Sequence, residues 1–134
     1  MRASVKKLTT ELIDFFNLKT FTFTLTFLDK KKDKSETLAD IDTENRYQRI
    51  TLSIYPRFFT EDQKEQRKTL VHEFCHTLLH DLEMCAWDLR NDKAVSKSHI
   101  EHTVEATTSK LENMLDKLLS DGKDLRKAYK DYLK

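Results

Sequence analysis

The sequence predicts a single α+β domain over residues 1–134, built from one helix, a three-stranded antiparallel sheet and three further helices. Three observations predict it. Apolar residues recur at helical spacing near the N-terminus, they alternate with polar residues in two short stretches before residue 56, and helical spacing returns after residue 60. The chain has one Gly and one Pro, and this scarcity of breakers favours long helices joined by few loops.

The first helix is predicted over residues 4–17. Its core face carries the apolar residues Val5, Leu8, Leu12, Phe15 and Phe16. A strict alternation over residues 21–27 then predicts a strand with Phe and Leu on one face and threonines on the other, which suits a sheet covered on one side only. The charged residues 29–35 are predicted as a hairpin tip. A nucleic-acid patch is disfavoured there, because the segment contains its own acids and lacks interleaved aromatics.

A second, weaker strand is predicted over residues 37–42, followed by a turn at 44–46. Alternating apolar residues predict a third strand over 50–55, which Pro56 ends. Three successive strands joined by short connections predict an antiparallel meander.

A capping box at residues 60–63 starts a helix that is predicted to run to about Met84. The aperiodic, polar residues 87–97 are predicted as a loop, and Ser98 opens the next helix. That helix is predicted to bury an apolar stripe of Ile100, Val104, Leu111, Leu115 and Leu118. A lysine-rich helix over 123–133 completes the predicted fold.

Composition excludes several classes of function. The 24 Lys and Arg residues balance 23 Asp and Glu residues, so net charge indicates neither nucleic acid nor a membrane as a partner. A phosphate-binding loop needs several glycines, and the chain has one. Cys75 and Cys85 lie ten residues apart on one predicted helix, about 15 Å, which is too far for a disulfide. With no apolar leader or membrane span in the sequence, we expect a cytoplasmic protein. We also expect it to be a monomer.

The motif H-E-x-x-H at His72, Glu73 and His76 indicates zinc binding and metal-assisted proton transfer. Two histidines four residues apart on a helix sit about 40° apart around the axis and one turn apart along it, so both imidazoles can bind one Zn²⁺. Glu73, beside the first histidine, can take a proton from a water that the metal activates. The pattern predicts a zinc site on the middle of a capped helix.

The third ligand is expected from the following helix. His80 continues the same helical face, but it stands about 12 Å along the axis from the first histidine, whereas ligand nitrogens lie about 2 Å from the metal. Glu101 is the favoured candidate, because a crossing helix can present a carboxylate to the two histidines. Three other side chains stay open as alternatives, Glu105, His99 and His102, and so does the absence of a third ligand.

These residues carry a resemblance to a known group of enzymes. The order of predicted elements and the H-E-x-x-H helix resemble the minigluzincins, the smallest gluzincin-type zinc metallopeptidases. The string H-E-F-C-H-T-L-L-H from His72 to His80 is similar to H-E-L-G-H-x-L-L-H of the ImmA/IrrE metallopeptidases, which occur in bacteria and mobile elements. Their third ligand sits in E-x-x-A-N; here Glu101 to Glu105 read E-H-T-V-E, and a related phage form, E-x-x-V-E-A, is closer.

The resemblance implies a zincin-like fold and a zinc-dependent endopeptidase that cleaves a peptide or protein substrate, with His72, His76 and Glu101 as metal ligands and Glu73 as catalytic base. It implies that the strand at Arg49 to Tyr55 binds the substrate backbone by strand addition. It also implies, as further possibilities, cleavage or sequestration of a transcriptional repressor and an inhibitory C-terminal helix. Two alternatives remain: a non-catalytic zinc-binding interaction module, and a purely structural helical domain whose histidine cluster is accidental.

Overall fold

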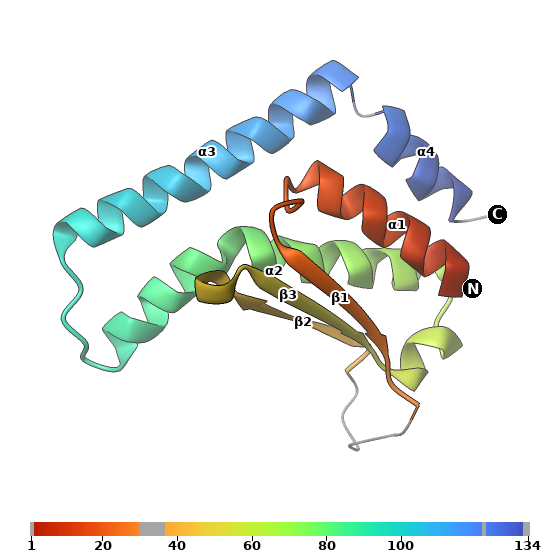
Figure 1. The fold of residues 1–134 in the computed structure, drawn as a ribbon, viewed down its shortest axis with the longest axis horizontal. Helices are drawn as coiled ribbons and strands as arrows, with labels where there is room; N and C mark the ends of the chain where they lie inside the picture. The colour runs from red at the N-terminus through yellow and green to blue at the C-terminus, as the bar shows by residue number, and fades with distance from the viewer. Residues whose placement is uncertain (1, 30–36, 122, 133–134) are drawn as a thin grey trace.

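The structure, a computed structural model, describes residues 2–29, 37–121 and 123–132. In chain order its elements are α1 (Arg2–Phe15), β1 (Thr22–Phe27), β2 (Ala39–Glu44), the short 3-10 helix η1 (Asn45–Tyr47), β3 (Arg49–Ile54), a second 3-10 helix η2 (Pro56–Thr60), α2 (Gln63–Arg90), α3 (Lys97–Asp121) and α4 (Lys123–Asp131). The predicted α+β class is confirmed, and the elements follow in the predicted order (Figure 1).

The sheet is mixed, so the predicted antiparallel meander is wrong. Its strand order is β1-β3-β2. β3 pairs antiparallel with β2, whereas β1 pairs parallel with β3, from Thr22 opposite Arg49 to Phe27 opposite Ile54. Alternation in a sequence specifies which face of a strand is buried, not which strand lies beside it. The hairpin tip predicted at 29–35 lies almost wholly outside the described residues, and β1 and β2 do not pair as a hairpin.

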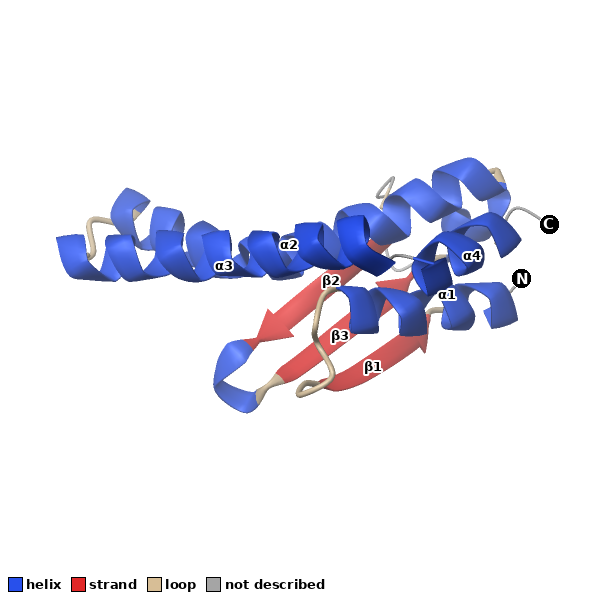
Figure 2. Ribbon diagram, turned by 90° about the horizontal axis from the view of Figure 1, so that it is seen from above, coloured by secondary structure: helices blue, strands red, loops and turns tan. Residues whose placement is uncertain are grey.

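One face of the sheet packs against α1 and α2, as Figure 2 shows from above. The core consists of Val5, Leu8, Leu12, Ala39, Leu52, Ile54, Phe58, Leu70, Phe74 and Tyr132, with the apolar side chains of β1 packed against it. Ile50, Leu52 and Ile54 are fully buried, as suits a central strand. On the other face, Thr22 and Thr24 are exposed, so the predicted one-sided covering of the sheet is confirmed.

α2 is longer than predicted, and its N-cap lies two residues later, at Asp62 instead of Thr60. The side chain of Asp62 accepts from the Glu65 backbone N–H at 2.8 Å, while the Thr60 hydroxyl donates to a carbonyl of η2. No breaker occurs before Asn91, so the helix continues six residues past Met84 to Arg90. Ser96, not Ser98, caps α3 by accepting from the His99 N–H at 3.0 Å. The loop is therefore residues 91–96 only.

α2 and α3 form an antiparallel hairpin whose closed end extends beyond the sheet (Figures 1 and 2). Thr103 and Thr107 are buried, and Lys110 Nζ lies 3.0 Å from Asp81 Oδ2 across the pair. The stripe that was predicted to be buried is instead largely exposed, with Leu115 at 55%. That prediction is wrong because the polar threonines, which bond back to carbonyls of their own helix, form the contact with α2.

α4 lies along α1 and brings the last described residues to the core. The buried Tyr132 hydroxyl donates to Gln66 Oε1 at 2.6 Å, and burial raises the pKa of Tyr132 to about 12. Cys85 is buried and Cys75 half-buried, and both are free thiols, as expected. Among the described residues, no helix is both long and apolar enough to span a membrane.

Candidate metal centre

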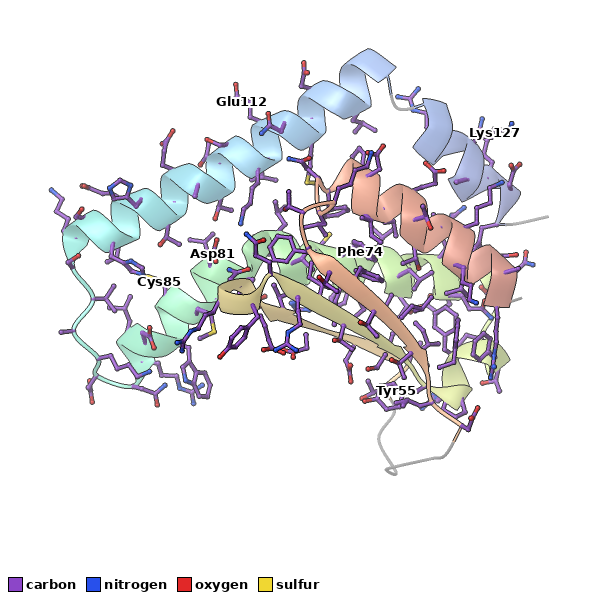
Figure 3. The ribbon with its side chains drawn as sticks, viewed as in Figure 1. Tyr55, Phe74, Asp81, Cys85, Glu112 and Lys127 are labelled. Atoms are coloured by element: carbon purple, nitrogen blue, oxygen red, sulfur yellow. The ribbon has the colours of Figure 1, made fainter. Side chains whose placement is uncertain are left out.

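The motif lies in the middle of α2, and the core fixes which way it faces. Phe74 is fully buried and stacks on Phe23 with ring centroids 5.8 Å apart, and it contacts Phe16 at 5.6 Å. Figure 3 shows Phe74 between α1, β1 and α2. Residues two apart on a helix point about 200° apart, so burial of Phe74 turns His72 and His76 to the opposite, exposed side.

The two motif histidines lie at the separation that a shared metal requires. Their Nε2 atoms are 3.3 Å apart, and the ring planes are nearly perpendicular at 88°. Zn–N bonds of about 2.0–2.1 Å in tetrahedral geometry place two nitrogens about 3.3–3.4 Å apart. The helix therefore presents two ligands at zinc spacing.

Glu83 orients His76, and the sequence analysis missed it. Its Oε1 lies 2.8 Å from His76 Nδ1. A carboxylate there accepts a hydrogen bond from Nδ1–H, and this tautomer carries its lone pair on Nε2, the atom that faces His72. A signal was present in the sequence, because residues seven apart on a helix lie on one face.

Replacement of Glu83 tests this role. We expect Glu83→Ala to lower zinc affinity about 10–100-fold, because loss of an outer carboxylate frees the imidazole to rotate and change tautomer. Glu83→Gln, which keeps an acceptor oxygen, should restore part of the loss. Competition against a chromophoric zinc chelator measures both, with Glu11→Ala as the control. Equal affinity in Glu83→Ala and the parent would remove Glu83 from the site.

Glu73 lies between α2 and the sheet, beside β2. It is half-buried, and its carboxylate accepts a hydrogen bond from the backbone N–H of Ile41 in β2. Burial raises the pKa of the Glu73 carboxyl above its ordinary value. Positive charge on His76 and His72 opposes the rise in this pKa, and Asp40 adds to it. Asp40 is itself held by the Tyr55 hydroxyl.

An open groove runs between α2 and the outer edge of β2. One hollow, of about 520 Å³, is lined by Thr37, Leu38, Ala39, Glu65, Lys68, Thr69, His72 and Glu73. A second, of about 290 Å³, is lined by Asp40, Ile41, Asp42, Thr43, Glu73, His76, His80 and Glu83. The two hollows share Glu73, so an extended chain lying along β2 would pass the motif.

The edge of the sheet that faces the motif belongs to β2. The strand that was expected to bind substrate, residues 49–55, contains β3, which is paired on both sides and has no free edge. That expectation is therefore wrong, for the same reason as the predicted meander. Among the described strands, β2 is the edge strand beside Glu73, so a peptide strand could add to β2 on this side of the sheet.

The structure does not bring Glu101 to the histidines. The ion pair between Lys110 and Asp81 fixes the register of the α2–α3 hairpin. Glu101 lies nine residues from Lys110 toward the loop, and His76 lies five residues from Asp81 in the other direction. At 1.5 Å per residue, Glu101 and His76 are about 21 Å apart along the helix axes. The Glu101 side chain is 64% exposed and pairs with Lys97 at 3.6 Å.

The other candidates on α3 are also distant. Glu105 is one turn nearer, about 15 Å along the axes from His76, and is exposed. His99 and His102 are exposed on the first turns of α3, next to the loop. His80 is half-buried and lines the second hollow with Glu73.

No three potential ligands converge within the part of the chain that the structure describes. The site therefore consists of two histidines at zinc spacing, a carboxylate that orients one of them and a half-buried glutamate beside a free strand edge. No family model matches the sequence, and neither a curated protein nor a solved structure matches it significantly.

Proposed function

We propose that this protein is a small zinc-dependent endopeptidase of zincin-like fold, with His72 and His76 as the ligands that α2 supplies and Glu73 as the catalytic base. The 3.3 Å separation of the two Nε2 atoms carries the proposal, because it equals the ligand spacing of a tetrahedral zinc site. The Glu83 carboxylate behind His76 supports it, since metal-binding histidines commonly donate their other N–H to such a group.

Zinc held by the two histidines would supply a Lewis acid that polarises the substrate carbonyl and acidifies a water. The Glu73 carboxylate would take a proton from the attacking water as the water oxygen adds to the carbonyl carbon, and would pass this proton to the amine nitrogen when the C–N bond breaks. The edge of β2 holds the peptide extended beside Glu73 by backbone hydrogen bonds. The substrate is therefore a peptide or an extended segment of a protein.

Glu101, the third ligand implied by the resemblance, enters the proposal as a variant to measure. With α3 placed as in the structure, Glu101→Gln leaves zinc content unchanged, because the carboxylate is about 21 Å along the axes from His76. Loss of zinc in Glu101→Gln would show that α3 takes a different position when the metal binds.

Metal analysis of the purified protein tests the zinc site. We expect one zinc per chain by mass spectrometry, and loss of this zinc in His76→Ala, which removes one of the two ligands at zinc spacing. His99→Ala is the matched control, because this exposed imidazole lies on the first turn of α3. Zinc-free parent protein, or zinc retained in His76→Ala, would contradict the proposal.

A second function is favoured by one observation. Catalytic zinc sites have three protein ligands, and the structure brings together only two. A non-catalytic zinc-binding module that sequesters a regulator would need no base, and the bound partner could supply the zinc ligands that the two histidines leave vacant. Zinc-loaded protein that cleaves nothing in a library of quenched peptides would favour this second function.

A further inference from the structure

An apolar stripe on α3 is exposed along most of the helix. We call Val104, Leu111, Leu115 and Leu118 the α3 stripe; their exposed fractions are 48%, 42%, 55% and 37%. They are spaced seven, four and three residues apart, so they lie on one side of the helix over about 21 Å. Burial of such side chains is favourable by about 1.5–3 kcal/mol each, so a partner that covers this surface would gain binding free energy.

The contact between α3 and α2 does not use this stripe. It uses Thr103 and Thr107, which are buried, and the ion pair of Lys110 with Asp81. Relative to Thr103, the stripe lies about 60–120° around the helix axis. The stripe therefore stays accessible beside α2 after the hairpin has formed.

Acidic residues border the stripe on the side away from α2. Two members of the stripe are followed directly by an exposed acid, Glu105 and Glu112. With Glu101, these acids form what we call the acidic row, about 160–200° around the axis from Thr103, and all three are exposed. Figure 3 shows Glu112 directed away from the other elements.

We propose that the α3 stripe and the acidic row bind an amphipathic helix of a partner protein, with an apolar face bordered by Lys or Arg. Apolar residues at this spacing form the contact face between two paired helices. Flanking charges of opposite sign determine which partner binds. This inference is independent of the proposed peptidase activity, because the stripe begins two turns beyond the loop and takes no part in the groove.

Charge and geometry argue against the two occupants that this chain could supply. A second copy packed antiparallel would place the two acidic rows side by side, and one packed parallel would direct each acidic row against α2 of the other copy. α4 is basic, but it packs on α1 through the buried Ala128 and Tyr132 and an ion pair of Lys7 with Asp131. A basic helix from another protein meets neither obstacle.

A synthetic helical peptide tests the surface directly. The probe is an 18-residue amphipathic helix of Leu and Lys with leucines at alternating spacings of three and four, and its counterpart carries Glu in place of Lys. We expect the Lys peptide to bind and the Glu peptide not to bind, by calorimetry at two salt concentrations. Higher salt should weaken the binding, because opposite charges border the apolar contact.

Variants locate the binding on α3. Leu111→Gln with Leu115→Gln should weaken binding at least about tenfold, because central apolar contacts dominate such interfaces. Leu89→Gln is the matched control, since this leucine is 50% exposed on α2. Glu105→Lys with Glu112→Lys should weaken binding and its salt dependence, whereas Glu11→Lys with Asp29→Lys, an equal change of net charge outside α3 and the groove, should not. All variants alter exposed or half-buried positions, and circular dichroism checks that each one folds.

Two results would overturn the proposal. Equal binding of the Lys peptide to the parent and to the stripe variant would show non-specific charge attraction. A dimer of the parent in light scattering that the stripe variant abolishes, without peptide binding, would show that a second copy covers the stripe. Neither result depends on zinc or on cleavage, so failure here is distinguishable from failure of the peptidase proposal.

Discussion

Glu73→Gln is expected to abolish peptide cleavage while leaving zinc bound. Gln matches the size of Glu but cannot take a proton from the attacking water, and loss of a general base costs about 10²–10⁴-fold in rate. Glu73 is not one of the two side chains at zinc spacing, so the metal should remain. Cleavage of quenched peptides by zinc-loaded protein, with zinc measured on the same sample, checks both expectations.

Glu11→Gln makes the same chemical change on α1, outside the groove, and should behave like the parent. If Glu73→Gln cleaves as fast as the parent, Glu73 is not the base. If it loses zinc together with activity, the side chain belongs among the metal ligands instead.

Phe74→Ala is expected to destabilise the fold by about 3–5 kcal/mol, the usual cost of truncating a fully buried Phe. The ring contacts Phe16, directly after α1, and Phe23 of β1, so its loss leaves a cavity that the surrounding elements cannot easily close. A domain of this size is stable by about 5–15 kcal/mol, so the urea midpoint should fall sharply. Tyr47→Ala, at a 58% exposed aromatic, should change stability by less than about 1 kcal/mol.

Phe74→Leu covers the case in which Phe74→Ala does not fold, because it keeps most of the buried volume. We expect it to lie between the parent and Phe74→Ala in urea unfolding. Parent-like stability in Phe74→Ala would show that the motif is not fixed by its buried neighbour.

Local patterns predicted the elements but not their partners. The alternation at β1 and β3 correctly gave the buried face of each strand, because that face depends only on neighbouring residues. Pairing of β1 with β3 depends on the path of the chain between them, and no residue pattern specifies that path. The error carried over to the substrate strand, since β3 lies in the middle of the sheet and the free edge is on β2.

In the site, too, local pattern predicted the parts within one element but not the contact between elements. His72, Glu73 and His76 lie within two turns of one helix, so helix geometry alone predicted their arrangement. The distance of Glu101 from the histidines depends on where α2 ends. A helix ending at Met84 leaves a long loop that could return a carboxylate to the histidines, whereas the helix continues to Arg90, about 9 Å further. Those six residues move the start of α3 away from the motif.

The parallel pairing of β1 with β3 also constrains the order in which the chain can fold. Thr22 lies opposite Arg49, 27 residues later, while β2 and β3 are joined directly through η1. Closing a long segment costs more chain entropy than closing a short one. The β2–β3 hairpin, whose outer edge lines the groove, can therefore form early, and β1 completes the sheet as a later, slower event. The groove edge and the last-docking strand lie on opposite sides of β3, so the groove side of the sheet does not have to await β1.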